Sequence, residues 1–176
     1  MLWTDKIDFL DTKQDLLVFL KLEMKDIHIS DLMRACGFLL EEAKFVQPKY
    51  ADKFIKSYVE GFILRVKELK DDNNKYKGSL NMGELQDSMQ LLDDQEKLVI
   101  KVRSVDSHFF KIYKIISLYT TYILEEPIHI VGTPFPGGFE VKYENGDYYC
   151  PVKDKQKDNP NAVCGFCIAI QDEDII

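Results

Sequence analysis

Residues 50–69 read YADKFIKSYVEGFILRVKEL, and the apolar side chains in this stretch recur every three or four positions. Side chains at that spacing lie on one face of an α-helix. They form two neighbouring lines, with Phe54, Tyr58 and Phe62 on one and Ile55, Val59, Ile63 and Val66 on the other. Together the two lines make a broad stripe, which predicts a helix that packs against more than one neighbour.

The same period extends over residues 11–126, so we expect a helical body around this segment. One helix begins at a cap provided by Asp11. A second begins at Ser30 and ends before Pro48. Residues 70–81 are polar and rich in turn formers, which predicts an exposed loop after the helix quoted above.

Two further helices are expected before the chain changes character. Asn81 and Glu84 resemble a capping pair that opens a short helix through residue 91 or 92. A last helix is predicted from about residue 95 to residue 124, with room for a break near Ser104. Pro127 stops this helix, because proline cannot continue the backbone hydrogen bonds.

The composition fits a folded globular protein. Of the 176 residues, 45% are hydrophobic and 30% are charged, far from the profile of a disordered chain. The net charge of -7 argues against a dedicated binder of nucleic acids or anionic membranes, since both need a basic surface. No apolar run approaches the roughly 18 to 20 residues that span a bilayer, and the N-terminus lacks a signal-peptide layout. We expect a cytoplasmic protein with no nucleic-acid or membrane partner, and leave a protein partner and the oligomeric state open.

After Pro127 the sequence turns to short β-branched and aromatic runs, and residues 128–152 read IHIVGTPFPGGFEVKYENGDYYCPV. Asn145-Gly146 between two such runs is the strongest short hairpin signal, so we expect a hairpin over residues 139–152. The expected fold is mainly α: a helical body over residues 1–126, with a small β-hairpin and cysteine metal knuckle over residues 127–176 packed on it. After Cys167 we expect a frayed acidic tail.

The cysteines cluster near the end of the chain. Cys150 precedes Cys164 by 14 positions, and Cys164 and Cys167 form a C-x2-C pair. One tight turn can aim two thiolates at an ion, and a hairpin can present a third ligand opposite. Zinc and a [4Fe–4S] cluster both prefer four ligands. Cys36 would be the fourth if its helix packs over the hairpin, and His129 is an alternative in the same unit.

Each of these assignments has a simpler alternative. Cys36 falls on a helical line of apolar residues, and a free cysteine on such a line is more often a core residue. His129 is more often an ordinary strand histidine, and the three C-terminal thiols could carry no metal. The E-x-x-H spacing of Glu126 and His129 is that of di-iron bundles, but Pro127 interrupts it, so we discount it.

Three functions remain open from the residues alone. The leading one is a metal-binding protein with a structural zinc and an interaction surface on its helices. The second is an iron–sulfur or thiol redox protein, although a thioredoxin fold is excluded because only nine residues follow Cys167. The third is a metalloenzyme that uses three cysteines and an open coordination position.

Residues 134–167 read PFPGGFEVKYENGDYYCPVKDKQKDNPNAVCGFC. This run resembles a family of uncharacterised proteins from methanogenic archaea. The resemblance rests on three motifs: the PFPGGF segment, the YYCPV segment of the hairpin and the CxFC knuckle. The resemblance covers about the last fifth of the chain, with Cys150, Cys164 and Cys167 as matched positions. It implies an anaerobic host, which favours iron–sulfur chemistry somewhat, and it implies no particular reaction.

Overall fold

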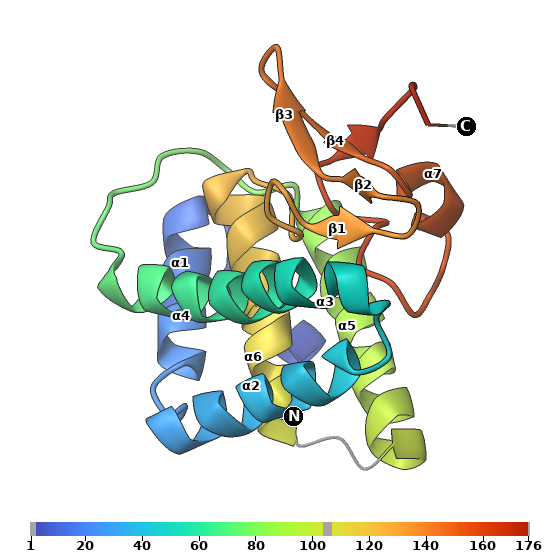
Figure 1. Cartoon of the computed structure of the whole chain (residues 1–176). Helices are drawn as coiled ribbons and strands as arrows, with labels where there is room; N and C mark the ends of the chain where they lie inside the picture. The colour runs from blue at the N-terminus through green and yellow to red at the C-terminus, as the bar shows by residue number, and fades with distance from the viewer. Residues whose placement is uncertain (1–2, 104–106, 176) are drawn as a thin grey trace.

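A computed structural model describes residues 3–103 and 107–175, and most of this chain is helical (Figure 1). The mainly α fold is confirmed. The helices are η1 (Trp3–Phe9), α1 (Lys13–Glu23), α2 (Ile29–Ala43), α3 (Pro48–Ile55), η2 (Lys56–Glu60), α4 (Gly61–Asp71), α5 (Met82–Arg103), α6 (Ser107–Leu118), η3 (Tyr119–Leu124) and α7 (Lys153–Gln156).

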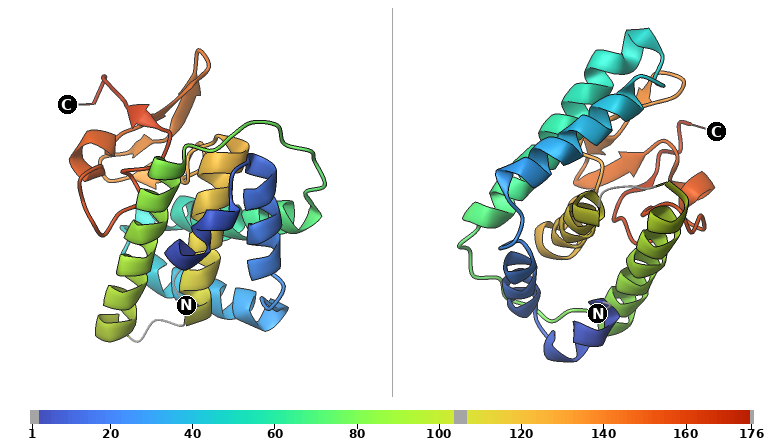
Figure 2. Two further views of the ribbon diagram at one scale, coloured as in Figure 1. Left: turned by 180° about the vertical axis from the view of Figure 1, so that it is seen from behind. Right: turned by 90° about the horizontal axis from the view of Figure 1, so that it is seen from below.

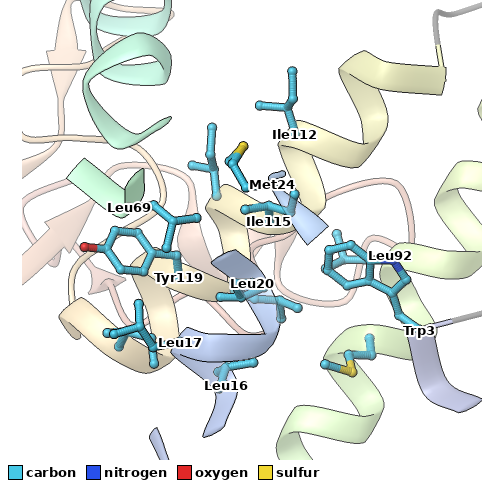
Figure 3. Packing of buried hydrophobic residues seen from close by; sticks show 14 of the residues in the cluster. Trp3, Leu16, Leu17, Leu20, Met24, Leu69, Leu92, Ile112, Ile115 and Tyr119 are labelled. Atoms are coloured by element: carbon cyan, nitrogen blue, oxygen red, sulfur yellow. The ribbon is translucent and has the colours of Figure 1, made fainter. Parts of the chain in front are cut away.

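Helix α6 runs through the middle of the helical body. Seen nearly end-on in Figure 2 (right), it has the other long helices around it. Its neighbours are α2, α4 and α5, while α1 packs on η3 at its C-terminal end. Ile112, Ile115 and Leu118 of α6 are fully buried. Figure 3 shows the side chains that meet them from the surrounding helices, among them Leu20, Leu69 and Leu92.

The stretch at residues 50–69 lies within one continuous helical rod. α3 passes into the π-helical turn η2, and η2 passes into α4. The rod contacts α2 and α6 on the body and the strand β1 (Pro134–Phe135) beyond it. The prediction of several packing neighbours is confirmed, because the broad apolar stripe faces both the body and the C-terminal segment.

Helix starts differ from the predictions by one or two residues. The cap of α1 is Thr12 rather than Asp11: the Thr12 Oγ1 accepts the Asp15 N–H at 3.1 Å, and the Asp15 carboxylate accepts the Thr12 N–H at 3.0 Å. α2 begins at Ile29, before Ser30, because the Asp31 carboxylate accepts the His28 N–H at 2.8 Å.

The predicted capping pair at the start of α5 is confirmed, with the Glu84 N–H donating to Asn81 Oδ1 at 3.3 Å and the Asn81 amide donating back to the Glu84 carboxylate at 2.7 Å. α5 then continues without a stop at residue 92 and runs to Arg103. No glycine or proline interrupts that stretch, so nothing local ends the helix. The break predicted near Ser104 lies outside the described residues.

A buried ion pair joins α5 to α6. The side chains of Asp93 and Lys114 are 0% and 2% exposed, and the Lys114 ammonium donates to the Asp93 carboxylate. The same ammonium lies 2.9 Å from a carboxylate oxygen of Glu96 and 4.6 Å from the centre of the Trp3 ring. Asp93 also accepts the Trp3 N–H at 3.0 Å, so this pair fixes η1 on the two helices.

A second buried carboxylate anchors the loop after α4. Asp72 accepts hydrogen bonds from the hydroxyls of Tyr119 and Tyr76, at 2.7 and 2.8 Å, and from the Asn74 N–H at 2.9 Å. Burial acts to raise the pKa of Asp72, but these donors outweigh it and hold the pKa below its usual value. Asp72 is therefore bound as a carboxylate under a loop whose other residues are largely exposed.

The predicted hairpin is confirmed around its turn and is wrong at its start. β3 (Lys142–Glu144) pairs antiparallel with β4 (Asp147–Cys150) across Asn145 and Gly146, whose φ angles of 54° and 97° are those of a tight hairpin turn. β2 (Phe139–Glu140) instead pairs with β1, because Gly137 and Gly138 take φ angles of 94° and 85° and reverse the chain earlier.

The residues after Cys167 are not a frayed tail. β5 (Ile170–Gln171) lies parallel to β4 and completes a three-stranded sheet. Asp172 is buried, and its backbone N–H donates to the Cys150 carbonyl at 3.0 Å. The end of the chain therefore returns to the strand that carries Cys150.

The C-terminal unit, residues 127–175, lies at one end of the body (upper right in Figure 1). One anchor is the buried amide of Gln95 on α5, which donates to the carbonyls of Pro160 and Ala162 at 2.9 and 3.1 Å. Val163 and Phe166 add side chains to the main core. Across the described ranges, no helix is long and apolar enough to cross a membrane.

Candidate cysteine site

Cys150 ends β4, and its thiol is buried where the C-terminal unit meets the helical body. Burial raises the pKa of this thiol, and the nearby Cys167 raises it further. The backbone N–H groups of Val152 and Lys153, together with the charge of Lys153, act in the opposite direction without outweighing burial. The thiol of Cys150 is therefore harder to ionise than a free thiol.

Residues 164–167, here called the cysteine turn, present the other two thiols. The Cys167 N–H donates to the Val163 carbonyl at 3.2 Å. The Lys153 ammonium donates to the carbonyls of Cys164 and Cys167 at 2.5 and 2.6 Å, which ties the turn to α7. A Cβ at Gly165 would lie 2.9 Å from the Lys157 carbonyl oxygen, so the turn packs this closely only because glycine stands there.

The structure brings Cys150, Cys164 and Cys167 close enough to interact electrostatically. The pKa of Cys164 is raised by burial and then by the other two thiols, while Lys153 lowers it. The three thiols come from two separate segments, since β4 carries Cys150 and the cysteine turn follows α7. Ionising one of them makes ionising the next more costly.

Two tyrosines of the helical body belong to the same site, and sequence reasoning did not identify them as functional. Tyr58 lies on η2, and burial with the neighbouring Cys150 and Cys164 raises the pKa of its hydroxyl. Tyr113 lies on α6, and burial with Cys164 raises its pKa as well. Both occupy apolar helical lines, where a tyrosine is indistinguishable from a packing residue. Lys153 gave no signal either, because it stands in a run of charged residues.

The two candidates for a fourth ligand lie in different places. Cys36 is half-buried on α2, and burial raises the pKa of its thiol. The structure does not bring it to the other three, because α2 runs along the end of the body away from β4 (Figure 1). His129 packs between the rings of Tyr58 and Phe135, with centroids 5.4 and 5.5 Å away. Burial lowers the pKa of His129 to about 4, so its imidazole is neutral near pH 7.

The thiols interact without converging on one point. Within residues 3–103 and 107–175, no three His, Cys, Asp or Glu side chains are arranged so that they could hold a metal ion. To share one ion, the three sulfur atoms would have to move toward one another. The chemistry available here is that of soft thiolate donors with a neutral imidazole nearby.

The comparisons with known proteins cover nearly the whole chain. A UPF0305 protein of Methanothermobacter thermautotrophicus is 39% identical over 165 residues, which is 93% of this chain and 99% of the relative. A UPF0305 protein of Methanococcus maripaludis is 31% identical over 85% of this chain and 90% of its own. The corresponding values for one from Methanocaldococcus jannaschii are 26%, 88% and 93%. No solved structure matches the chain.

The family model that matches residues 12–172 is described as "Uncharacterized protein conserved in archaea (DUF2115)". The predicted kinship with uncharacterised proteins of methanogenic archaea is confirmed, and the match covers the helical body as well as the C-terminal unit. The chain belongs to the archaeal DUF2115 family.

Proposed function

We propose that this protein binds one metal ion, zinc in preference to iron, through Cys150, Cys164 and Cys167. The observation that carries the proposal is the meeting of three thiols from two separate segments where the C-terminal unit joins the helical body. Thiolate sulfur is a preferred ligand of zinc. An ion at this place would join β4 and the cysteine turn.

The electrostatics of the site support a bound cation. Burial, and after it the neighbouring thiols, raise the pKa of Cys150 and of Cys164, so these two thiols resist ionisation while no cation is present. A divalent ion reverses this balance, because metal binding requires deprotonated sulfur and releases the protons. The N–H groups of Val152 and Lys153 lower the cost of ionising Cys150, although they do not outweigh its burial.

We infer a structural role for the ion from the size of the C-terminal unit. Its strands are two to four residues long, and short hairpins are marginally stable alone in water. A metal bound between β4 and the cysteine turn would add a link that the backbone pairing does not supply. Lys153 already orients the backbone of the cysteine turn, so the change that remains is the approach of the three sulfur atoms.

His129 suits the fourth position better than Cys36. Its neutral imidazole is the form that binds metal, and it lies beside Tyr58, which in turn lies near Cys150 and Cys164. Ligation by Cys36 would need α2 to approach the C-terminal unit, and it stays a prediction that a variant can test.

Metal analysis of anaerobically purified protein tests the proposal. We expect close to one zinc per chain, loss of that zinc in Cys164→Ser, and at least tenfold weaker binding in His129→Gln. Cys36→Ser is the matched control, since it changes a half-buried thiol on another element, and it should keep full occupancy.

The other outcomes separate the remaining functions. A brown protein that contains iron and sulfide would show that the site holds an iron–sulfur cluster instead of zinc, and it would favour a role in electron transfer. Loss of metal in Cys36→Ser would make Cys36 the fourth ligand. Metal-free protein that takes up no zinc on reconstitution, with all four thiols titratable, would refute metal binding.

A further inference from the structure

A cavity of about 640 Å³ lies on the side of the body where the cysteine turn meets α5, and it is separate from the thiols. We call it the polar cavity. Its walls are the first half of α5, the π-helical turn η3, the start of α1 and the back of the cysteine turn. Its polar lining residues are Lys13, Ser79, Asn81, Glu84, Asp87, Ser88, Thr121, Tyr122 and Glu125.

The hydroxyl groups of the polar cavity have few protons left to donate. The Ser88 Oγ donates to the Glu84 carbonyl at 2.8 Å. The Tyr122 hydroxyl lies 2.6 Å from the Ser88 Oγ and 3.0 Å from the same carbonyl oxygen, so its proton is also used within this group. Because each hydroxyl carries one proton, the lone pairs that remain are hydrogen-bond acceptors.

Thr121 also lines the polar cavity and is only 5% exposed. Its Oγ1 makes no hydrogen bond within the described part of the protein, but this oxygen is enclosed by protein and has no surface open to the cavity. A ligand in the polar cavity therefore does not reach it.

The charges of the polar cavity are mainly negative. The lining carries three carboxylates, on Glu84, Asp87 and Glu125, and one ammonium, on Lys13. That ammonium is already paired with the Glu125 carboxylate at 2.6 Å. Glu84 and Asp87 are three residues apart on α5 and lie near the Tyr122 hydroxyl, because both help burial to raise its pKa. Acceptors and carboxylates therefore dominate the lining, and they match a ligand rich in N–H donors.

We propose that the polar cavity binds a small organic cation, an aliphatic amine or guanidine. Its charged end lies between Glu84 and Asp87 and donates to the Tyr122 oxygen. Its aliphatic part packs on Leu80, Leu91 and Phe166, which supply the apolar lining. This inference goes beyond the proposed metal site and requires no metal.

The polar cavity also gives the ligand contact with the cysteine turn. Gly165 and Phe166, between Cys164 and Cys167, line it directly. A cation bound here would pack against the back of the turn and restrict its motion. Binding would slow the reaction of Cys164 and Cys167 with a thiol reagent, while Cys36 on α2 would react at an unchanged rate.

Calorimetric titration with cadaverine, a linear aliphatic diamine, tests the proposal, and pentanediol serves as its uncharged counterpart. We expect saturable binding of one cadaverine per chain and none of pentanediol. The double variant Glu84→Gln and Asp87→Asn should weaken binding about tenfold or more, because it removes charged acceptors and keeps the shape.

Asp94→Asn is the control, since Asp94 is an exposed carboxylate on the same helix, outside the polar cavity and paired with Lys97. Circular dichroism verifies that each variant is folded. The proposal is overturned if cadaverine shows no saturable binding, if pentanediol binds equally well, or if Asp94→Asn weakens binding as much as the double variant.

Discussion

Replacing Lys114 by methionine should destabilise the protein by about 3 kcal/mol or more. The substitution keeps the aliphatic stem and removes the charge, which leaves the carboxylate of Asp93, 0% exposed, without its cation. Removing one partner of a buried ion pair typically costs about 3–5 kcal/mol. We expect the lower end of this range, because Asp93 still accepts the Trp3 N–H at 3.0 Å.

Urea and thermal unfolding measure this effect directly. For a chain of this size about 3 kcal/mol corresponds to a loss of roughly 6–12 °C in Tm. The matched control is Lys97→Met on the same helix. Lys97 pairs with Asp94 at 3.0 Å, but both side chains are more than half exposed, so its loss should cost about 1 kcal/mol or less.

A double-mutant cycle isolates the pair from the rest of the packing. Asp93→Asn combined with Lys114→Met leaves two neutral groups of the original shape, and we expect it to recover at least about 1 kcal/mol relative to the sum of the single changes. Equal losses of unfolding free energy in Lys114→Met and Lys97→Met would refute the reasoning that Asp93 becomes a buried charge without a partner. A double-mutant cycle with no coupling energy would refute it as well.

The remaining predictions concern the loop anchor and the C-terminal unit. Tyr119→Phe should cost about 1.5–3 kcal/mol at neutral pH, because the hydroxyl donates to a carboxylate. Since the pKa of Asp72 is lowered in the folded state, its stabilisation is present above about pH 4 and is lost as the pH falls below that. The difference between Tyr119→Phe and the native chain in urea unfolding should shrink over the same range, and a constant difference would contradict this. Gly165→Ala should destabilise by about 1–3 kcal/mol in urea unfolding, because its Cβ would meet a backbone oxygen at 2.9 Å; an unchanged midpoint would count against this. If a structural ion is present, a chelator should increase hydrogen exchange over residues 127–175 and leave α6 protected, and unchanged exchange after metal removal would argue against a structural role.

The fold was predictable where local sequence controls local structure. The Asn145-Gly146 turn, the Asn81 cap and the apolar stripe from Phe54 to Val66 each act within a few residues, and each is confirmed in type. The choice of Thr12 over Asp11 as a cap depends on which oxygen reaches the Asp15 N–H, and composition does not reveal that.

The predictions failed where distant segments decide the outcome. β5 forms because the chain returns to pair with β4, and a two-residue strand in front of an acidic stretch gave no sign of this. The site is predicted in part: spacing identified the three C-terminal thiols, whereas Tyr58 and Tyr113 are brought to them by helix packing. Lys153 bonds the two carbonyls of the cysteine turn only because α7 folds over it.

The π-helical turns η2 and η3 each hold an extra residue beside a site. A π turn holds about one residue more than an α turn, so removing that residue restores an ordinary turn and leaves the flanking helices in nearly the same orientation. Deleting a single residue from η2 would therefore keep α4 close to its place on the body and would disturb mainly the turn that carries Tyr58. The same deletion in η3 would shift Thr121 and Tyr122 at the polar cavity and leave α6 in place. A one-residue deletion in an ordinary α turn would instead rotate the whole following helix by roughly 100°.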